Sequence, residues 1–327
     1  MDVVSKNIGS FFIVSFPESA PGDDTLYYLQ DNHIGGLILF AEHCRDRTSL
    51  KSWLADFKKT LGRPLLVAVD QEGGRVRRFT RGFPSLESPR YYGHRRKLDR
   101  YRSDLSRICE KLYETGININ LVPTVDLLDT EEGHVLDTRT FSDDPEVVAR
   151  FVRATIDIHH DHGLLTCAKH FPGLGRSRGD PHEILAASDL NEEDFRMTEL
   201  RPFKDAIEAG VDTVMVTHLS VPQVDDNPAI ASDRIITGWL KDQLEFGGAV
   251  ITDDLLMQGA SEVDSVPNLA VRSFAAGSDL LLFGRQLKMT RKAFDRFWKY
   301  RDEGELSLDR LNDAAKRVKI LMEKIVS

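Results

Sequence analysis

Four side chains that can move protons or hold hydroxyl groups lie in one short polar stretch, Lys169 to Leu185 (KHFPGLGRSRGDPHEIL). Lys169 and His170 open this stretch, and Asp180 and His182 follow with one residue between them. That spacing lets a carboxylate hold one imidazole nitrogen while the other faces a substrate, as in a general acid or base. Any one of these residues alone is most often a cap or a solvated loop residue. Their concentration in one glycine-rich segment favours a functional loop.

The elements that position this stretch follow from hydrophobic patterning. The apolar run 164–168 predicts a buried strand with Lys169 and His170 at its carboxyl end, before a turn at Pro172 and Gly173. Similar runs recur, and the eight predicted strands cover 11–16, 36–40, 65–69, 117–121, 164–168, 213–217, 249–252 and 279–283. Helical patterns fill most gaps, at 50–61, 105–115, 145–160, 199–209 and 235–244.

Eight strand–helix units in 327 residues favour an α/β fold with a single closed (β/α)₈ barrel over an open doubly wound sheet. No early glycine-rich dinucleotide turn and no linker are present, so we expect one catalytic domain over residues 1–327. The segment 306–326, capped near Ser307, has the apolar spacing of a closing helix. In such barrels the chemistry lies at the carboxyl ends of the strands, where Asp70, His218 and Asp253 are also expected.

Composition limits the partners. The chain holds 43 basic and 52 acidic residues, a net charge of −9, so neither nucleic acid nor a membrane surface is expected as a partner. Cys44, Cys109 and Cys167 are widely spaced and suit free thiols in a reducing compartment. The amino-terminal apolar run is too short for a signal peptide or a membrane span, which makes the cytoplasm the expected location.

A second polar motif, VAVDQEGGRVRRF, follows the third predicted strand. Asp70 ends the apolar run, Gly73 and Gly74 permit tight backbone, and Arg75 and Arg78 follow at helical spacing. Carboxylate and guanidinium together suit sugar hydroxyls. Asp70 as a structural cap with Arg78 as its salt-bridge partner is an equally good interpretation.

Four segments together resemble the family 3 glycoside hydrolases, and in particular their bacterial β-N-acetylhexosaminidase branch. These segments are DQEGGRVRRF, GININLVPTVD, KHFPG with Asp180-Pro181-His182, and VITDDLLMQGA. The resemblance runs from about Ile34 to the terminal helix. It implies a single (β/α)₈ barrel that releases terminal β-linked N-acetylglucosamine with retention of configuration, without metal or cofactor, in the usual setting of cell-wall recycling.

The resemblance also implies roles for individual residues. The ITDDLLM motif places the nucleophile on Asp253, and Asp254 is expected to be a helix N-cap. His182 with Asp180 matches the acid/base pair of this branch. The substrate-binding positions match Asp70, Arg78, Arg139, Lys169 and His170.

The chain departs from the branch pattern KHFPGHGDT, which makes leaving-group preference an open question. Leu174 and Arg176 replace a histidine and an acidic residue, and Pro181 stands where serine is common. Arg176 and Arg178 suggest an anionic aglycone such as a muramic-acid carboxylate or a phosphate. The alternatives are a family 3 β-glucosidase, an N-acetylglucosaminide phosphorylase, or a non-catalytic sugar-binding barrel.

A cluster of imidazoles, His159, His160 and His162, invites a metal interpretation. Its position before Gly163 suits a helix end instead, where cationic side chains favour the macrodipole and glycine ends the helix. We expect no metal there. His218 is expected near the pocket without a catalytic role.

Overall fold

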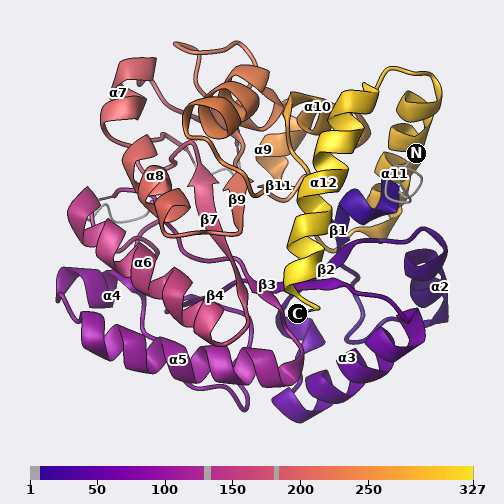
Figure 1. Cartoon of the computed structure of the whole chain (residues 1–327), viewed down its shortest axis with the longest axis horizontal. Helices are drawn as coiled ribbons and strands as arrows, with labels where there is room; N and C mark the ends of the chain where they lie inside the picture. Colours follow the sequence, from indigo (N-terminus) through magenta and orange to yellow (C-terminus); the bar gives the residue numbers. More distant parts are fainter. Residues whose placement is uncertain (1–7, 129–133, 180–183, 327) are drawn as a thin grey trace.

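The computed structural model describes residues 8–128, 134–179 and 184–326, and it shows a ring of eight parallel strands surrounded by helices (Figure 1). The ring consists of β1 (Phe12–Val14), β2 (Gly36–Leu39), β3 (Leu66–Val69), β6 (Ile119–Asn120), β7 (Leu165–Phe171), β9 (Thr213–Val216), β11 (Ala249–Thr252) and β12 (Leu281–Leu282). Their order is β11-β9-β7-β6-β3-β2-β1-β12, and a parallel bridge between Ile251 and Leu280 joins the two ends. The predicted (β/α)₈ barrel and all eight predicted strands are confirmed.

The strands form where they were predicted because each is a continuous apolar run that is covered on both faces. All four residues of β3 are buried, as are all four of β11. The aromatic rings of Phe12 and Phe283 stack at 5.4 Å between centroids, which ties β1 to the end of β12.

Helices cover the outside of the ring (Figure 1). The longer ones are α2 (Asp23–Asp31), α3 (Arg47–Leu61), α5 (Leu98–Thr115), α6 (Pro145–Asp161), α8 (Leu200–Glu208), η4 (Arg234–Gln243), α10 (Val266–Ala276), α11 (Leu287–Asp302) and α12 (Leu308–Lys324). Local signals set their ends: the Asp46 carboxylate caps α3 by accepting the Ser49 N–H, and Gly62 ends it with φ of 62°. All five predicted helices are present, although η4 has the wider π-helical pattern.

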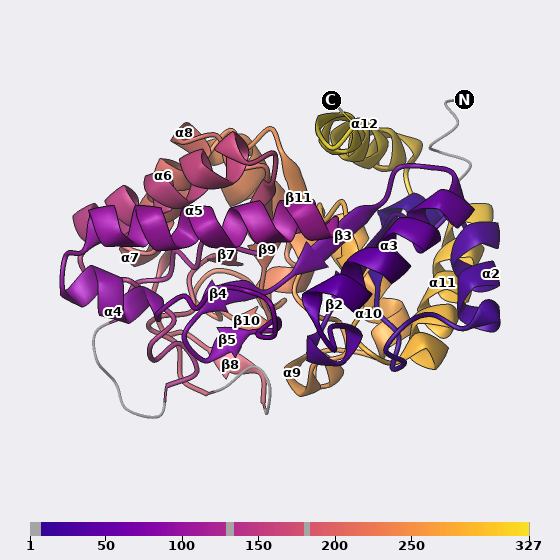
Figure 2. The same cartoon turned by 90° about the horizontal axis from the view of Figure 1, so that it is seen from below.

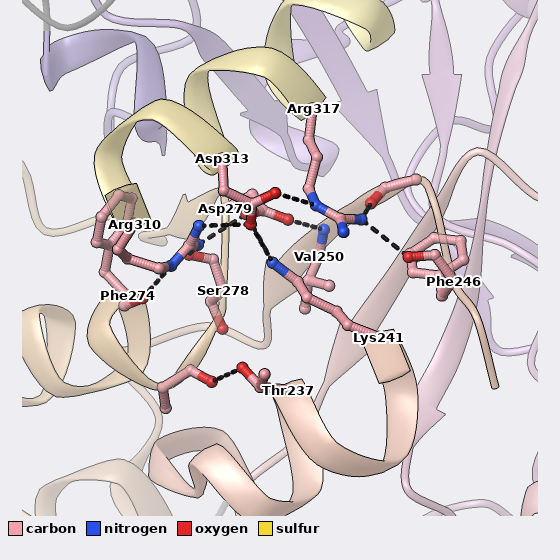
Figure 3. A network of polar contacts seen from close by, with 12 residues as sticks. Thr237, Lys241, Phe246, Val250, Phe274, Ser278, Asp279, Arg310, Asp313 and Arg317 are labelled. Carbon is pink, nitrogen blue, oxygen red and sulfur yellow. Dashed lines mark hydrogen bonds and ion pairs between the residues drawn. The ribbon is translucent and has the colours of Figure 1, made fainter. Parts of the chain in front are cut away.

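The closing helix α12 lies under the amino ends of the barrel strands. In Figure 2 it lies on the side opposite the hairpin of β4 (Gln71–Gly73) and β5 (Val76–Arg77). Figure 3 shows how it is fastened: Arg310 lies 2.7 Å from the carboxylate of Asp279, which also takes Lys241 at 3.1 Å. Asp279 is fully buried and accepts the Val250 N–H over 2.9 Å. Helix α12 therefore closes the barrel at the amino ends of its strands, and the polar loops lie at the opposite, carboxyl ends.

The segment after β3 differs from expectation. Arg75 and Arg78 do not share a helix, because β4 and β5 pair as an antiparallel hairpin. Gly73 and Gly74 turn this hairpin with φ of 103° and 57°. A Cβ on Gly73 would lie 2.3 Å from the Glu87 carbonyl oxygen, so the close approach requires glycine here. The predicted helical spacing was therefore wrong, and the predicted tight backbone was right.

Candidate active site

A cavity of about 600 Å³ opens at the carboxyl ends of the strands. Six of the predicted site residues line it together, namely Asp70, Arg78, Arg139, Lys169, His170 and Asp253. Lys169 and His170 lie at the carboxyl end of β7, and the others come from segments after β3, β6 and β11, which the parallel topology brings to one rim.

A buried ion cluster forms one wall of this cavity. Lys169 Nζ lies 2.7 Å from Asp70 Oδ1 and 2.7 Å from Glu72 Oε1. Burial alone would raise the pKa of both carboxyls, but the charges of Lys169 and the neighbouring arginines hold each pKa below its usual range. The same carboxylates outweigh burial at Lys169 and raise its pKa. All three groups are therefore charged at neutral pH.

Arg139 extends this cluster from the segment after β6. Its Nε and Nη2 donate to the two carboxylate oxygens of Glu72 over 2.9 and 2.8 Å. Its Nη2 also lies 3.2 Å from His170 Nε2. The bidentate pairing fixes the plane of the guanidinium, so its donors have set directions toward the cavity.

The side chain of His170 is oriented by Asp126, a buried residue after β6. Asp126 Oδ2 lies 2.7 Å from His170 Nδ1 and accepts the His170 backbone N–H over 3.1 Å. Asp126 Oδ1 accepts the Leu174 N–H over 2.7 Å. With Nδ1 protonated toward Asp126, Nε2 is the acceptor that faces Arg139. The end of β7 and its turn therefore close onto one carboxylate.

Asp253 stands at the carboxyl end of β11 with a fixed orientation. Thr217 Oγ1 donates to Asp253 Oδ2 over 3.0 Å, and the Asp254 N–H donates to Asp253 Oδ1 over 2.9 Å. These hydrogen bonds fix the orientation of the carboxylate, which lies at the cavity surface.

Asp254 does not cap a helix as predicted, because α9 (Gln258–Ser261) begins four residues later, after Met257. Asp254 Oδ1 instead accepts the N–H groups of Leu256 and Gly284 over 3.0 and 2.9 Å, which ties β11 to β12. Burial, reinforced by the charge of Asp253, raises its pKa to about 6.

The proteins that this sequence resembles are consistent with the cavity and its lining residues. Residues 3–321 match the N-terminal domain of glycosyl hydrolase family 3. The chain belongs to glycosyl hydrolase family 3. A β-hexosaminidase from Tolumonas auensis is 35% identical over 256 residues, which are 76% of this chain and 75% of that protein.

Solved structures of family 3 enzymes superpose closely on this barrel. A family 3 β-N-acetylglucosaminidase from a Paenibacillus species has a TM-score of 0.95 and 28% identity. It matches all of this chain, but this chain spans only 63% of that protein, less than two thirds. A β-N-acetylhexosaminidase from Beutenbergia cavernae has a TM-score of 0.88 and 25% identity, with 99% of both chains covered. The family predicted from the sequence is confirmed.

In this family 3 glycoside hydrolase, the predicted acid/base residues Asp180 and His182 lie outside the described residues. The departures that precede them are described. Leu174 lines the cavity, whereas Arg176 and Arg178 do not. Arg176 lies 3.3 Å from the buried carboxylate of Glu199, and Arg178 pairs with Asp189. Because neither guanidinium lines the cavity, the geometry gives no direct support to their predicted role in binding an anionic aglycone.

The imidazoles at the end of α6 each lie within hydrogen-bond distance of another protein group. His159 Nδ1 lies 2.7 Å from the Thr155 carbonyl oxygen, and burial lowers its pKa to about 4. His160 Nε2 pairs with Asp212 at 2.8 Å, and His162 Nε2 lies 2.8 Å from Ser106 Oγ. Among the residues that the structure describes, no group of three His, Cys, Asp or Glu side chains is arranged to hold a metal ion. Within the same residues, no helix is long and apolar enough to cross a membrane.

Three charged residues of this site had no predicted role, namely Glu72, Asp126 and Arg285. Glu72 lies two residues after Asp70 in the motif already singled out, and Asp126 ends the motif GININLVPTVD. Their positions in these motifs were the sequence signals that could have identified them. Arg285 follows β12, and no local pattern distinguishes it from a surface arginine.

Proposed function

We propose that this chain is a retaining exo-β-N-acetylglucosaminidase that forms a covalent glycosyl intermediate on Asp253. The observation that carries the proposal is the placement of the Asp253 carboxylate in the same cavity as the buried cluster of Asp70, Glu72, Lys169 and Arg139. The names of the related proteins, β-hexosaminidase and β-N-acetylglucosaminidase, support the choice of sugar.

The chemistry follows from the charge distribution. The cluster around Lys169 offers both charged donors and carboxylate acceptors to the hydroxyl groups of a pyranose. Asp253, ionised and held by Thr217, can then attack the anomeric carbon from one face. Because the cluster forms a buried wall of the cavity, we expect the sugar that it holds to be a terminal one.

The proton donor in this proposal is His182, oriented by Asp180, in the chain that follows β7. An imidazole with an ordinary pKa near 6.5 can protonate the leaving oxygen and then accept a proton from water. Asp180 would set the tautomer and stabilise the imidazolium. The proposal places the whole reaction on one domain and extends to cytoplasmic turnover of cell-wall fragments.

The test is a turnover and labelling experiment. Nitrophenyl β-N-acetylglucosaminide and β-glucoside should be assayed with and without inorganic phosphate, and we expect hydrolysis of the first in both conditions. A glucosaminide turned over only with phosphate would show a phosphorylase, and faster cleavage of the glucoside would show a β-glucosidase.

A 2-fluoro-sugar inhibitor should label Asp253, as located by mass spectrometry of digested enzyme. Asp253→Asn should abolish turnover with an unchanged melting temperature, because only the attacking carboxylate is lost. Asp254→Asn is the matched control and should retain labelling. A label on Asp254 would overturn the assignment of the nucleophile.

A further inference from the structure

The cavity has a second wall that the proposed reaction does not use. It is built from the ends of β2 and β12, and its centre is the ring of Phe40, only 8% exposed. The guanidinium carbon of Arg285 lies 4.3 Å from the centre of this ring, and that of Arg78 lies 5.5 Å from it. Two cationic side chains therefore contact the same aromatic ring at the rim of the cavity.

The guanidinium of Arg78, on this wall, is only loosely paired. Arg78 reaches Asp70 at 3.4 Å, but Lys169 lies closer to the same carboxylate, at 2.7 Å. The buried cluster thus pairs Asp70 and Glu72 with three cationic side chains, Lys169, Arg139 and Arg78, while Asp253 and Asp254 line the same cavity. Arg78 Nε is buried and has no hydrogen-bond partner among the described residues.

Arg285 has a single, weakly placed acidic partner within the described part of the chain. Its Nε lies 3.0 Å from Glu42 Oε1, and the two side chains are 53% and 30% exposed. A pair this exposed is screened by solvent and contributes little to stability. An incoming anion can therefore displace Glu42 from the guanidinium at small cost.

The backbone places Arg285 next to the reacting centre. The N–H of Gly284, the residue before it, donates to Asp254 Oδ1 over 2.9 Å. Asp254 in turn donates its own N–H to the carboxylate of Asp253. A group held by Arg285 would therefore belong to the substrate portion beside the bond that is cut.

We propose that Arg285, seated on Phe40, is a specificity-determining residue that pairs with a carboxylate or phosphate carried by the substrate beside the scissile linkage. This inference rests on the proposed function. The planar guanidinium matches either anion with two parallel hydrogen bonds, which an ammonium group does not reproduce. Glu42 occupies the guanidinium in the free enzyme and competes with the anion.

The test compares kcat/KM for matched substrates. One pair is nitrophenyl β-N-acetylglucosaminide with and without a 6-phosphate on the released sugar, and the other is an aryl β-N-acetylglucosaminide with and without a carboxylate on the aglycone. For at least one pair, Arg285→Ala should lower the ratio of anionic to neutral kcat/KM by about tenfold or more, since a charged hydrogen-bonded pair is lost. Arg285→Lys should restore only part of the ratio.

Glu42→Gln provides a control of opposite sign, because it removes the competing carboxylate. It should raise the same ratio by about two- to fivefold, as expected for loss of an exposed ion pair. The pair of substrates that responds shows whether the anion lies on the released sugar or on the aglycone, and either result supports the proposal.

Unchanged ratios in both Arg285 variants would overturn the inference while turnover of the neutral substrate still supported the proposed function. An equal loss on neutral and anionic substrates would also overturn it, since Arg285 would then only support the fold of the rim. A wild-type enzyme that cleaves none of the four substrates would reject the proposed function and this inference with it.

Discussion

The Nδ1 atom of His170 lies 2.7 Å from a carboxylate oxygen of Asp126. The same carboxylate accepts two backbone N–H groups, from His170 and Leu174. An amide at this position has one acceptor oxygen and would present a donor to the imidazole. We expect Asp126→Asn to lower kcat/KM on an aryl N-acetylglucosaminide by about 10- to 100-fold, by analogy with the loss of residues that orient metal-bound histidines.

Asp137→Asn is a suitable control, because its side chain is 30% exposed and its one ion pair among the described residues is with Arg90, at 3.6 Å. Steady-state kinetics and melting temperature should be measured for both variants. A loss in Asp126→Asn that matched its loss of stability, with normal kinetics for the folded fraction, would contradict the orienting role.

Substitutions at His182 and Asp180 test proton donation. If His182 protonates the leaving oxygen, His182→Ala should slow the cleavage of substrates with poor leaving groups far more than that of nitrophenyl substrates. The nitrophenolate group of these substrates leaves without being protonated. Asp180→Ala should show the same trend more weakly, because the imidazole remains but loses its orienting partner. Rates across a series of aryl glycosides, with azide as a rescuing nucleophile, measure this. A uniform loss without rescue would mean that another group carries the proton.

The buried carboxyl of Glu199 should make stability depend on pH. Its side chain is 1% exposed, and burial, with the nearby charge of Asp126, raises its pKa from 4.5 to about 8 despite Arg176. A raised pKa means that the neutral form is favoured in the folded state, so the contribution to stability is complete below about pH 4.5 and is lost as pH rises toward 8.

We therefore expect Glu199→Gln to match wild type near pH 4.5 and to become the more stable protein above pH 8, by on the order of a few kcal/mol. Urea unfolding at several pH values measures the difference. Glu208→Gln, at the exposed last residue of α8, the helix that Glu199 directly precedes, should follow wild type throughout. A wild type whose advantage over Glu199→Gln grew with pH would show that the carboxyl is ionised and favourably paired.

The polar network around Asp279, which holds α12 against the amino ends of the strands, should contribute strongly to the stability of the protein (Figure 3). Asp279→Ala would leave the largely buried side chains of Lys241 and Arg310 without their shared carboxylate, because these are only 7% and 13% exposed. We expect the free energy of unfolding to fall by about 3–5 kcal/mol. Asp302→Ala, which removes a 63% exposed carboxylate, should cost less than about 1 kcal/mol. Equal losses in the two variants would contradict this assignment.

The positions of the strands could be predicted from the sequence because burial on both faces requires continuous apolar runs, such as 66–69 and 249–252. Residues at the carboxyl ends of parallel strands share one rim by topology alone, so Asp70, Lys169 and Asp253 could be expected together from their places along the chain. The start of the closing helix was equally accessible, because its local cap Ser307 was predicted and its hydroxyl accepts the Arg310 N–H.

Side-chain partners depended on the tertiary structure. Glu72 meets Arg139 across 67 residues, and Asp126 meets His170 across 44, because adjacent strands place them within hydrogen-bond distance. A local motif carries no information on such pairings, since they depend on register and side-chain direction across the barrel. The same reason explains why the helical spacing expected of Arg75 and Arg78 was wrong and why Arg285 was not singled out. The order of residue types along the chain determined which groups reach the rim, and packing between distant strands decided which of them meet.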